Sequence, residues 1–462
     1  MKSISDRLNR LIDNENTVLQ GFQNYSLKNI EYILKYFGNP HKKIKSVHIA
    51  GTNGKGSVAY MLRNILSDSG YRVGLYTSPH LTKINERINI NFKDITDKKL
   101  NIYIEELFDL LDKENEIHPT YFDALTLFAF RYFHEQGVDI SIIETGLGGR
   151  LDSTNVISPE ISIITDISYD HKDVLGNTIK EIASEKAGII KSKSMTITSN
   201  TKKDILEIIS YKAKEYGSNL YILNRNFSTK NIRYSKKTGF IFDFYYKNYM
   251  IKNEITHSTN KKEQLPLSND FSIKEIPLNN KCRFQIKNSS LVIAASLLLN
   301  NSGFKIKEAN IKKGIAGVEI PGRFQILSQS PLIIFDPAHN IDALKSIIQS
   351  LKEGFPDKVF SVLLSFMMDK EYLSMLEIIK KDLTDDIYYY ELQDDRSLKV
   401  SDQIGTDKTT AYNNLKIFSN INDLTNNLQT NLDNKSSLFI TGSFRLFNIA
   451  KSISEKLTGD KT

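Results

Sequence analysis

The sequence predicts an α/β protein with mainly parallel sheets, and three observations carry that prediction. Short β-branched runs alternate with amphipathic stretches along most of the chain, starting at residues 46–50 and 58–66. A glycine-rich turn joins that first strand to that first helix. The chain has 462 residues, of which 40% are hydrophobic, whereas one domain usually holds roughly 100–200 residues. Two or three units with buried cores are therefore expected.

The strands and helices follow from the spacing of apolar residues. After the first strand, further buried strands are expected at residues 72–76, 138–143, 161–167, 195–198, 332–335, 359–364, 387–392 and 438–440. A helix is expected at 121–136, because apolar residues recur on one face and Gly137 follows as a stop. A second helix is expected at 288–300.

Two changes in pattern organise the chain. Residues 222–281 are rich in Lys, Asn and alternating aromatics, which predicts an excursion that carries a hairpin. The run Asn301-Ser302-Gly303 then offers a break. We therefore expect one domain at residues 1–302 and a smaller one at 303–462.

Charge and cysteine content exclude several classes of protein. The net charge is 61 − 54 = +7, but the lysines are spread evenly and form no stripe with aromatics, so no nucleic-acid partner is expected. The single Cys282 rules out an internal disulfide and a cysteine-based metal cluster. No apolar run approaches the roughly 18–20 residues of a membrane helix, and the first residues lack the apolar centre of a secretory signal. We expect a cytoplasmic protein with no membrane partner.

The segment at residues 47–57 predicts a nucleotide site. An apolar strand runs into Gly51-Thr52-Asn53-Gly54-Lys55-Gly56-Ser57 and then into a helix. Backbone N–H groups of such a turn, a Lys ammonium and a Ser hydroxyl together bind phosphate oxygens and Mg²⁺. The spacing differs from the usual G-x-x-x-x-G-K-[ST], so a glycine-rich structural turn is the alternative. The residues expected to bind ATP here are Asn53, Gly54, Lys55, Gly56 and Ser57.

Three polar residues fall just past predicted strands, where ligands gather in open α/β sheets. Ser78, Glu144 and His171 offer a hydroxyl, a carboxylate and an imidazole, which suit a divalent ion that keeps water and bridges phosphates. Each has a structural alternative. Ser78 could shape a turn, Glu144 could pair with Arg150, and His171 could cap a helix or lie on the surface.

Several ordered motifs reveal a family resemblance. The chain resembles the Mur ligase superfamily and, within it, the folylpolyglutamate synthase and dihydrofolate synthase branch, whose phosphate loop reads G-T-N-G-K-G-[ST]. Matching motifs keep their order from about residue 39 to 445, and they include residues 51–57, 77–81, 85–88, 144–155, 170–171, 185–189, 321–323 and 336–340.

The resemblance implies both a fold and an activity. The fold is a P-loop-containing, mainly parallel-sheet ATPase domain followed by a smaller Rossmann-like α/β domain. The activity is that of an ATP-dependent acid–amino-acid ligase, which adds L-glutamate to dihydropteroate, to folates or to both through an acyl phosphate. It implies ATP as co-substrate, two Mg²⁺ ions and a monomer. Phe284, Pro337 and Asp123 depart from the branch pattern, so a ligase with a non-folate carboxylate acceptor is the alternative.

By resemblance, Lys186 is a carbamylated lysine that holds the second Mg²⁺, while Ser78, Glu144 and His171 hold the first. From the residues alone, Lys186 reads as a solvated helix lysine paired with Glu185 or Glu181. Thr178 and Glu181 form a capping-box pattern at the start of that helix.

The resemblance also assigns the acceptor, the nucleotide and the catalytic residues. The pterin-bearing acceptor is expected to contact Tyr121, Phe122, Asp123, Leu151, Asp152 and Ser153. Phe122 could stack on a flat ring or be a core aromatic, and Asp152 could bond pterin N–H groups. Asn288, Arg323 and Asp336 are expected to bind ATP, and Lys55, Lys186 and His339 are the catalytic candidates.

Overall fold

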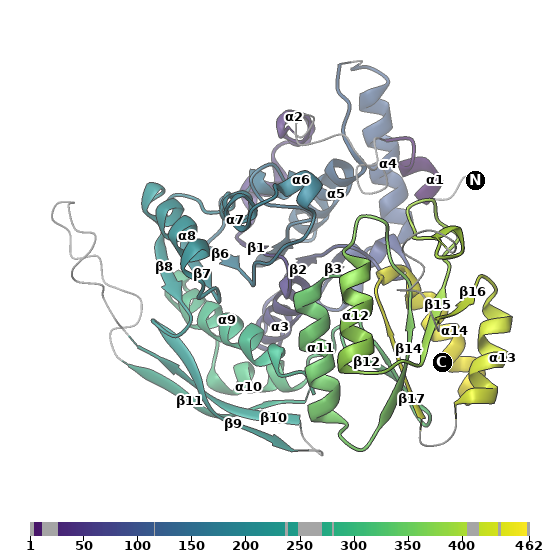
Figure 1. Ribbon diagram of the computed structural model, residues 1–462. Coiled ribbons are helices and arrows are strands. Elements are labelled where there is room, and N and C mark those ends of the chain that lie inside the picture. Colours follow the sequence, from purple (N-terminus) through teal and green to yellow (C-terminus); the bar gives the residue numbers. More distant parts are fainter. Residues whose placement is uncertain are drawn as a thin grey trace. The chain divides into compact units, whose positions relative to one another are not determined.

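The chain divides into two compact units in the computed structural model (Figure 1). Unit 1 comprises Met1–His80 and Ile84–Glu319, and unit 2 comprises Leu81–Lys83 and Ile320–Thr462. The structure describes residues 4–11, 26–114, 116–235, 239–247, 270–279, 281–403, 415–432 and 436–459.

The division between the units differs from the expected one after residue 302, and helix α10 (Glu308–Ala316) explains the difference. This helix packs on α3 (Lys55–Asp68) so closely that a Cβ at Gly314 would lie 2.5 Å from Ile65 Cγ1. Lys313 also forms an ion pair with Asp68. The segment after residue 302 therefore belongs with unit 1.

Unit 1 is built on an eight-stranded sheet that is parallel except at one edge, where β3 and β4 run antiparallel. Its order is β4 (Lys93–Asp94), β3 (Ile88–Ile90), β2 (Val73–Tyr76), β5 (Ile140–Glu144), β1 (Ser46–Ala50), β6 (Ile161–Ile164), β7 (Met195–Thr198) and β8 (Asn219–Ile222). The helices are α1 (Ile4–Leu8), α2 (Lys28–Tyr36), α3, α4 (Asp97–Leu111), α5 (Tyr121–Glu135), α6 (Lys172–Leu175), α7 (Ile179–Ala187), α8 (Lys203–Glu215), α9 (Phe284–Leu299) and α10.

Helices cover both faces of this sheet, which is why its central strands are buried throughout. Figure 1 shows α3 and α9 on one side and α5 and α7 on the other. Every residue of β1 and β5 is buried. Buried strands of this kind are typical of parallel sheets with two covered faces. Because the faces are covered, the loops expected to bind ligands are those at the carboxyl ends of β1, β2, β5 and β6.

A second, antiparallel sheet in unit 1 has the order β11 (Phe271–Leu278), β10 (Gly239–Tyr246) and β9 (Phe227–Ser235). Phe240, Phe242, Phe244 and Tyr246 are buried on one face of β10, and the sheet contacts α9 and α10. The hairpin expected within residues 222–281 is therefore confirmed as β9–β10. Residues 236–238, 248–269 and 280 of that range lie outside the described residues.

Unit 2 contains a six-stranded sheet in which only β12 runs antiparallel to its neighbour. Its order is β12 (Gln325–Gln329), β13 (Leu332–Phe335), β17 (Ser436–Thr441), β14 (Val359–Leu364), β15 (Ile387–Tyr390) and β16 (Leu415–Phe418). Its helices are α11 (Ile341–Gly354), α12 (Tyr372–Asp382), α13 (Ile421–Asn431) and α14 (Phe447–Thr458).

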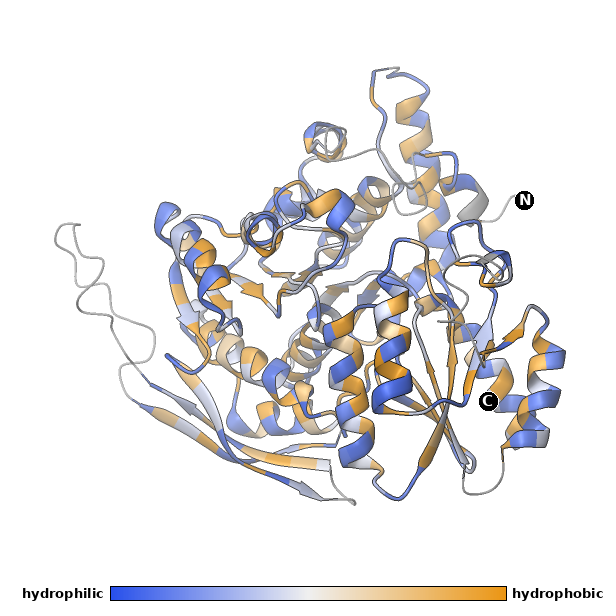
Figure 2. Ribbon diagram, in the orientation of Figure 1, coloured by the Kyte–Doolittle hydropathy of each residue, from blue (hydrophilic) through white to orange (hydrophobic). Residues whose placement is uncertain are grey.

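The helices of unit 2 are amphipathic. In Figure 2, α11 is hydrophilic on one side and hydrophobic on the other. Leu344, Ile347, Ile348 and Leu351 form its buried side, at the spacing of one helical face. The predicted fold class, a mainly parallel α/β unit followed by a smaller α/β unit, is confirmed.

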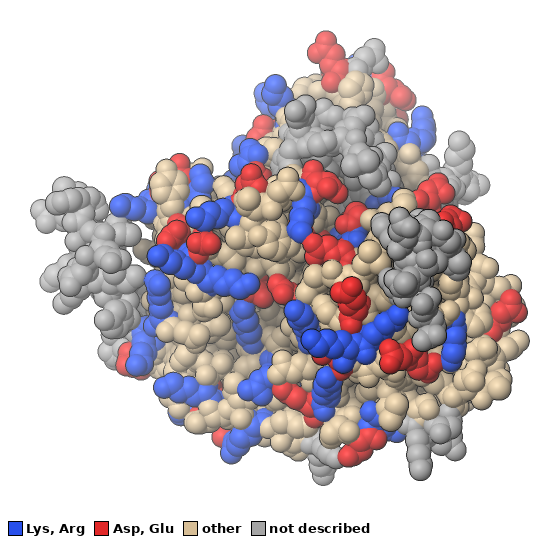
Figure 3. Space-filling model, viewed as in Figure 1, with Lys and Arg blue, Asp and Glu red and all other residues tan. Residues whose placement is uncertain are grey.

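Surface charge and hydropathy add two observations. On the face drawn in Figure 3, Lys and Arg side chains are interspersed with Asp and Glu. Among the described helices, none has the length and apolar character needed to cross a membrane.

Candidate active site

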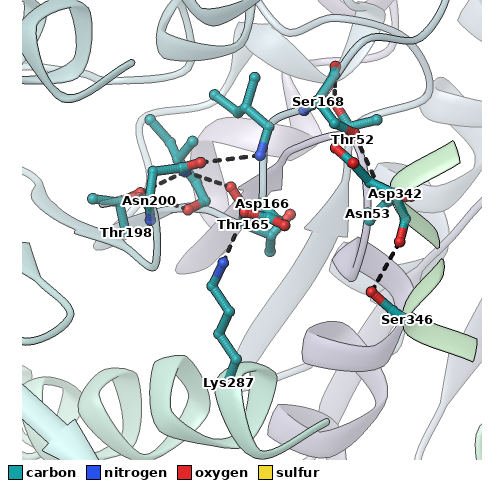
Figure 4. Close-up of polar contacts among 12 residues, drawn as sticks. Thr52, Asn53, Thr165, Asp166, Ser168, Thr198, Asn200, Lys287, Asp342 and Ser346 are labelled. Atoms are coloured by element: carbon teal, nitrogen blue, oxygen red, sulfur yellow. Dashed lines mark hydrogen bonds and ion pairs between the residues drawn. The ribbon is translucent and has the colours of Figure 1, made fainter. Parts of the chain in front are cut away.

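The turn between β1 and α3 is held in shape by the loop that follows β6 (Figure 4). The backbone N–H groups of Thr52 and Asn53 donate to the Asp166 carbonyl at 2.8 and 3.3 Å. The Thr52 hydroxyl donates to the Ser168 carbonyl at 3.0 Å and accepts from the Ser168 N–H at 3.1 Å. β6 ends at Ile164, earlier than expected, because the residues after it turn to make these bonds. The phosphate loop is thus fixed by a partner more than 100 residues away.

Close approach explains two of the glycines in this loop. A Cβ at Gly51 would lie 1.8 Å from Thr165 Oγ1, and one at Gly54 would lie 2.6 Å from Asn288 Oδ1. Gly54 also has a φ of +92°, in the left-handed region that favours glycine. Asn288 on α9 therefore packs directly against the phosphate loop.

Asn288 and its neighbour join the loop to the first turn of α3. The Asn288 amide donates to Gln285 Oε1 at 2.8 Å, and the Gln285 amide donates to Ser57 Oγ at 3.1 Å. Helix α9 begins at Phe284, one turn before the expected start, so that both side chains point along one helical face. Lys287, between them, pairs with Asp166 at 2.8 Å (Figure 4).

Two lysine side chains converge on a single carbonyl of the loop. Lys55 Nζ donates to the Gly51 carbonyl at 3.1 Å, and Lys186 Nζ donates to the same oxygen at 2.8 Å. Lys186 is 4% exposed. Burial and the neighbouring Lys55 ammonium lower the pKa of Lys186 to about 7. A substantial fraction of this amine is therefore neutral and nucleophilic near neutral pH.

The alternative of a solvated Lys186 is wrong, because the side chain is buried, and the carboxylates expected to pair with it are engaged elsewhere. Glu185 pairs with Arg150 at 2.9 Å. Glu181 forms the predicted capping box with Thr178. Lys186, in the last turn of α7, thus points to the loop at the carboxyl end of β1.

The metal-ligand candidates are brought together in part. The Ser78 N–H donates to Glu144 Oε2 at 3.3 Å, and Glu144 is buried. A Cβ at Gly56 would lie 3.7 Å from that carboxylate, so Glu144 borders the phosphate loop. His171 lies beside Asp170, with its Nε2 3.8 Å from Asp170 Oδ2, and its side chain is 42% exposed. Arg150 pairs with Glu185, although an Arg150–Glu144 pair was the alternative.

Oxygen chemistry at this edge fits a hydrated divalent ion. Within the described part of the chain, no three His, Cys, Asp or Glu side chains form a group that could hold a metal. Ser78 and Glu144 supply a hydroxyl and a carboxylate next to a phosphate-binding turn, which suits Mg²⁺ because that ion keeps waters and takes phosphate oxygens as ligands.

The first group of expected acceptor residues lies at the start of α5. Asp123 is buried and forms a capping box with Thr120, and its Oδ1 accepts from the Ser153 hydroxyl at 2.6 Å. Burial raises the pKa of this carboxyl. Phe122 is half-buried against Gly146, where a Cβ would lie 2.6 Å from its ring. The structure therefore unites Phe122, Asp123 and Ser153 around one loop.

Both carboxylate oxygens of Asp152 accept hydrogen bonds from within that loop. Its Oδ2 accepts from the Leu147 N–H at 2.8 Å, and its Oδ1 accepts from the Thr154 N–H at 3.0 Å and from the Thr154 hydroxyl. A direct bond from Asp152 to a pterin N–H group would have to compete with these donors. Leu151 is half-buried beside it, and Tyr121 is buried with the Arg87 guanidinium 5.6 Å from its ring.

Three predicted residues of unit 2 meet at the carboxyl end of β13. Asp336 is buried, and its Oδ2 accepts from the Phe324 N–H at 2.9 Å. Burial raises the pKa of Asp336 to about 6, although Arg323 opposes the shift. The Arg323 guanidinium lies 4.6 Å from the Phe444 ring, and the His339 ring lies 6.0 Å from the same ring.

Comparisons with known proteins identify the family of this two-part arrangement. The Mur ligase middle domain matches residues 49–296, and the Mur ligase glutamate ligase domain matches residues 322–444. The chain belongs to the Mur ligase family. Its Mur ligase middle domain holds the phosphate loop, Glu144 and Lys186, and its glutamate ligase domain holds Arg323 and Asp336.

Relatives place this Mur ligase in one branch. It is 33% identical over 366 residues to the dihydrofolate synthase/folylpolyglutamate synthase of Bacillus subtilis, covering 76% of this chain and 77% of that protein. Folylpolyglutamate synthase of Mycobacterium tuberculosis, solved with ADP and AMPPCP, is 26% identical with a TM-score of 0.79 over 95% of this chain and 96% of that one. An FPGS–AMPPCP–folate complex is 26% identical, with a TM-score of 0.79 over 100% of both chains. The chain is thus a member of the folylpolyglutamate synthase/dihydrofolate synthase branch.

Sequence reasoning missed two residues at this Mur ligase site. His48 is buried in the middle of β1 and bonds Thr154. A polar residue inside an otherwise apolar strand was the available signal. Phe444 follows β17 and contacts both Arg323 and His339, but no motif pointed to it.

Proposed function

We propose that this chain is an ATP-dependent ligase that adds L-glutamate to dihydropteroate, to folates or to both, releasing ADP and phosphate through an acyl phosphate. The observation that carries the proposal is the convergence of Lys55 and Lys186 on the Gly51 carbonyl, next to the buried Glu144. The Lys55 ammonium at a glycine-rich turn, beside a buried carboxylate that can hold a divalent ion, suits a reaction in which phosphates and a carboxylate, all anionic, must be brought together. The activities named for the relatives support glutamate and a folate as the other substrates.

The phosphate loop is the proposed nucleotide site. Residues 53–57 offer backbone N–H groups, the Lys55 ammonium and the Ser57 hydroxyl, and Asn288 lies against Gly54. In unit 2, we assign Arg323 to the nucleotide phosphates and Asp336 to hydrogen bonds from ribose or adenine. His339 donates its Nδ1–H to the Pro337 carbonyl at 2.8 Å, and we assign its ring to the incoming amino acid or the γ-phosphate.

Ser78, Glu144 and His171 would hold one Mg²⁺ ion. When bound, Mg²⁺ supplies positive charge against the phosphate oxygens. Lys186 would hold a second ion if its amine were carbamylated. Carbamylation requires a neutral amine, and a pKa of about 7 provides one. The same burial that lowers this pKa shields Lys186 from solvent.

The acceptor is assigned to the loop next to α5. Phe122 presents a half-buried ring, with Tyr121, Asp123, Leu151, Asp152 and Ser153 around the same segment. The single cysteine supports a cytoplasmic location, and membership of the branch supports a monomer.

The test is a product assay with purified protein. ATP, Mg²⁺ and L-glutamate are incubated separately with dihydropteroate and with tetrahydrofolate, and phosphate release and product mass are measured. We expect a product heavier by one glutamyl residue with at least one acceptor, and no phosphate release when glutamate is omitted. Absence of a glutamate adduct with every pterin would overturn the folate acceptor. It would leave the non-folate carboxylate acceptor as the alternative.

A further inference from the structure

A chain of buried polar groups links the centre of the unit 1 sheet to the acceptor loop. His48 is fully buried in β1, paired with Ile143 of β5 on one side and Ser162 of β6 on the other. Its Nε2 lies 2.8 Å from the Thr154 hydroxyl. That hydroxyl in turn contacts Asp152. Neither the phosphate loop nor the metal candidates use this histidine.

The hydrogen bonds fix the proton on the His48 ring. The Thr154 hydroxyl donates its hydrogen to Asp152 Oδ1, so it must accept from His48, whose Nε2 therefore carries the proton. His48 Nδ1 is buried without a hydrogen-bond partner in the structure. Burial also lowers the pKa of His48 to about 3, which keeps the ring neutral. A neutral Nε2–H imidazole satisfies every bond observed here.

The network ends on the residues that form the acceptor loop. Asp152 Oδ2 accepts from the Leu147 N–H, next to the Gly146 that packs under Phe122. The residue after Asp152 is Ser153, whose hydroxyl bonds Asp123. Asp152 thereby connects both sides of the loop, and Thr154 connects Asp152 to the rigid central strand. A shift of Thr154 would move all of these groups together.

We propose that His48 is a positioning residue for the acceptor: its Nε2–H orients Thr154 and Asp152, and through them it holds the loop at residues 146–153 in the shape that receives the acceptor. This inference rests on the proposed function in that it takes the acceptor to be a pterin. A histidine kept only for packing would leave the acceptor site unchanged when its donor is replaced by an apolar group. A positioning histidine predicts a selective effect on one substrate.

The test compares variants that remove or keep the donor. His48→Leu removes it, Thr154→Val removes the hydroxyl at constant shape, and His48→Gln places an amide donor near the position of Nε2. Thr196→Val is the matched control, because Thr196 is a buried hydroxyl of the same sheet that bonds Ser218 instead. KM for acceptor, KM for ATP, kcat and thermal unfolding are measured for each.

We expect the KM for acceptor to rise roughly tenfold in His48→Leu and Thr154→Val, with the KM for ATP within about twofold of wild type. His48→Gln should recover most of the loss, and Thr196→Val should leave both constants unchanged. An unchanged acceptor KM in His48→Leu, or an equal rise in the KM for ATP, would overturn the proposal.

A spectroscopic measurement on the wild-type chain tests the role of His48 even if the variants fold poorly or no pterin is turned over. Long-range ¹H–¹⁵N correlation of ¹⁵N-histidine-labelled protein should show His48 protonated on Nε2 and bare on Nδ1 at pH 6 and pH 8. A proton on Nδ1, or an imidazolium at pH 6, would refute the positioning role. Wild-type inactivity with every pterin, together with the expected tautomer, would refute only the pterin acceptor, so the two failures are distinguishable.

Discussion

The loop after β1 in unit 1 and the loop after β13 in unit 2 are alike in position but differ in the charge type of the buried group beside them. Each follows a buried parallel strand and leads into a helix, and each is accompanied by a buried ionisable group. Burial lowers the pKa of Lys186 to about 7 and raises that of Asp336 to about 6. Desolvation disfavours the charged form in both cases. Both loops therefore hold a group that titrates near neutral pH.

Both loops are held by partners that are distant in the sequence. The phosphate loop depends on distant partners, because Ser168 bonds Thr52 and Asn288 touches Gly54. The unit 2 loop has distant partners as well, because the Asp336 N–H donates to the Ile440 carbonyl at 3.0 Å and the Thr441 hydroxyl donates to the Ala338 carbonyl at 3.3 Å. Because the buried groups differ in charge type, substitution of Lys186 should mainly affect turnover, and substitution of Asp336 should mainly affect the pH dependence of stability.

Among the substitutions proposed for the two loops, removal of the buried Lys186 amine should have the largest effect on turnover. Lys186→Ala is expected to lower kcat about 1,000-fold, or ~4 kcal/mol, because it removes the group that sits with Lys55 at the phosphate loop. Lys180→Ala on the same helix is the control, since Lys180 is exposed and pairs only loosely with Asp204 at 3.9 Å. Steady-state kinetics of both variants provide the measurement. Wild-type turnover in Lys186→Ala would contradict the site assignment.

Replacing the buried carboxyl should change the pH dependence of stability. The pKa of Asp336 is about 6 in the folded chain against 3.8 for the unperturbed group, so the folded state binds this proton more tightly. The contribution of Asp336 is present below pH 4 and is lost as the pH rises through 6.

Asp336→Asn cannot titrate and should lack this decline. The difference between wild type and variant in free energy of unfolding should therefore change by about 3 kcal/mol between pH 4 and pH 7. Urea unfolding at several pH values measures it. A difference that does not vary with pH would show that Asp336 does not titrate as described.

A pair of glycines at the two ends of α3 should give the smallest effect. Gly54 and Gly70 have φ values of +92° and +91°, so alanine strains the backbone equally at both positions. Only at Gly54 would the new Cβ meet a neighbour, Asn288 Oδ1 at 2.6 Å. We expect Gly54→Ala to weaken binding of a non-hydrolysable ATP analogue about tenfold, or ~1.4 kcal/mol, and Gly70→Ala to leave it unchanged. Isothermal titration calorimetry measures the affinity of both variants for the analogue. Equal affinities would show that the contact between Gly54 and α9 does not contribute to nucleotide binding.

The sequence predicted the elements that are buried and bounded by turn residues. The bounds of β1, β7, β13 and β14 match the expected ranges, because β-branched and other apolar residues predominate in these mostly buried strands. The edge strands β4 and β16, and β3 beside β4, were missed, because each has only 2–4 residues and includes a polar residue. Short edge strands depend on their neighbours more than on their own sequence.

The site was predictable where one segment carries the chemistry, as in the glycine-rich turn. Contacts between distant segments were not predictable. The capping box at Thr178 indicated a helix but not that Lys186 turns inward. Likewise, His48 and Thr154 are 106 residues apart, so their bond exists only once the sheet has formed.

The most direct test of the central claim follows an oxygen atom from the acceptor to phosphate. An acceptor labelled with ¹⁸O in its reacting carboxylate is incubated with ATP, Mg²⁺ and L-glutamate, and the released phosphate is analysed by mass spectrometry. Activation through an acyl phosphate predicts one ¹⁸O atom in each phosphate released with product. Unlabelled phosphate, or ¹⁸O recovered in AMP, would contradict it.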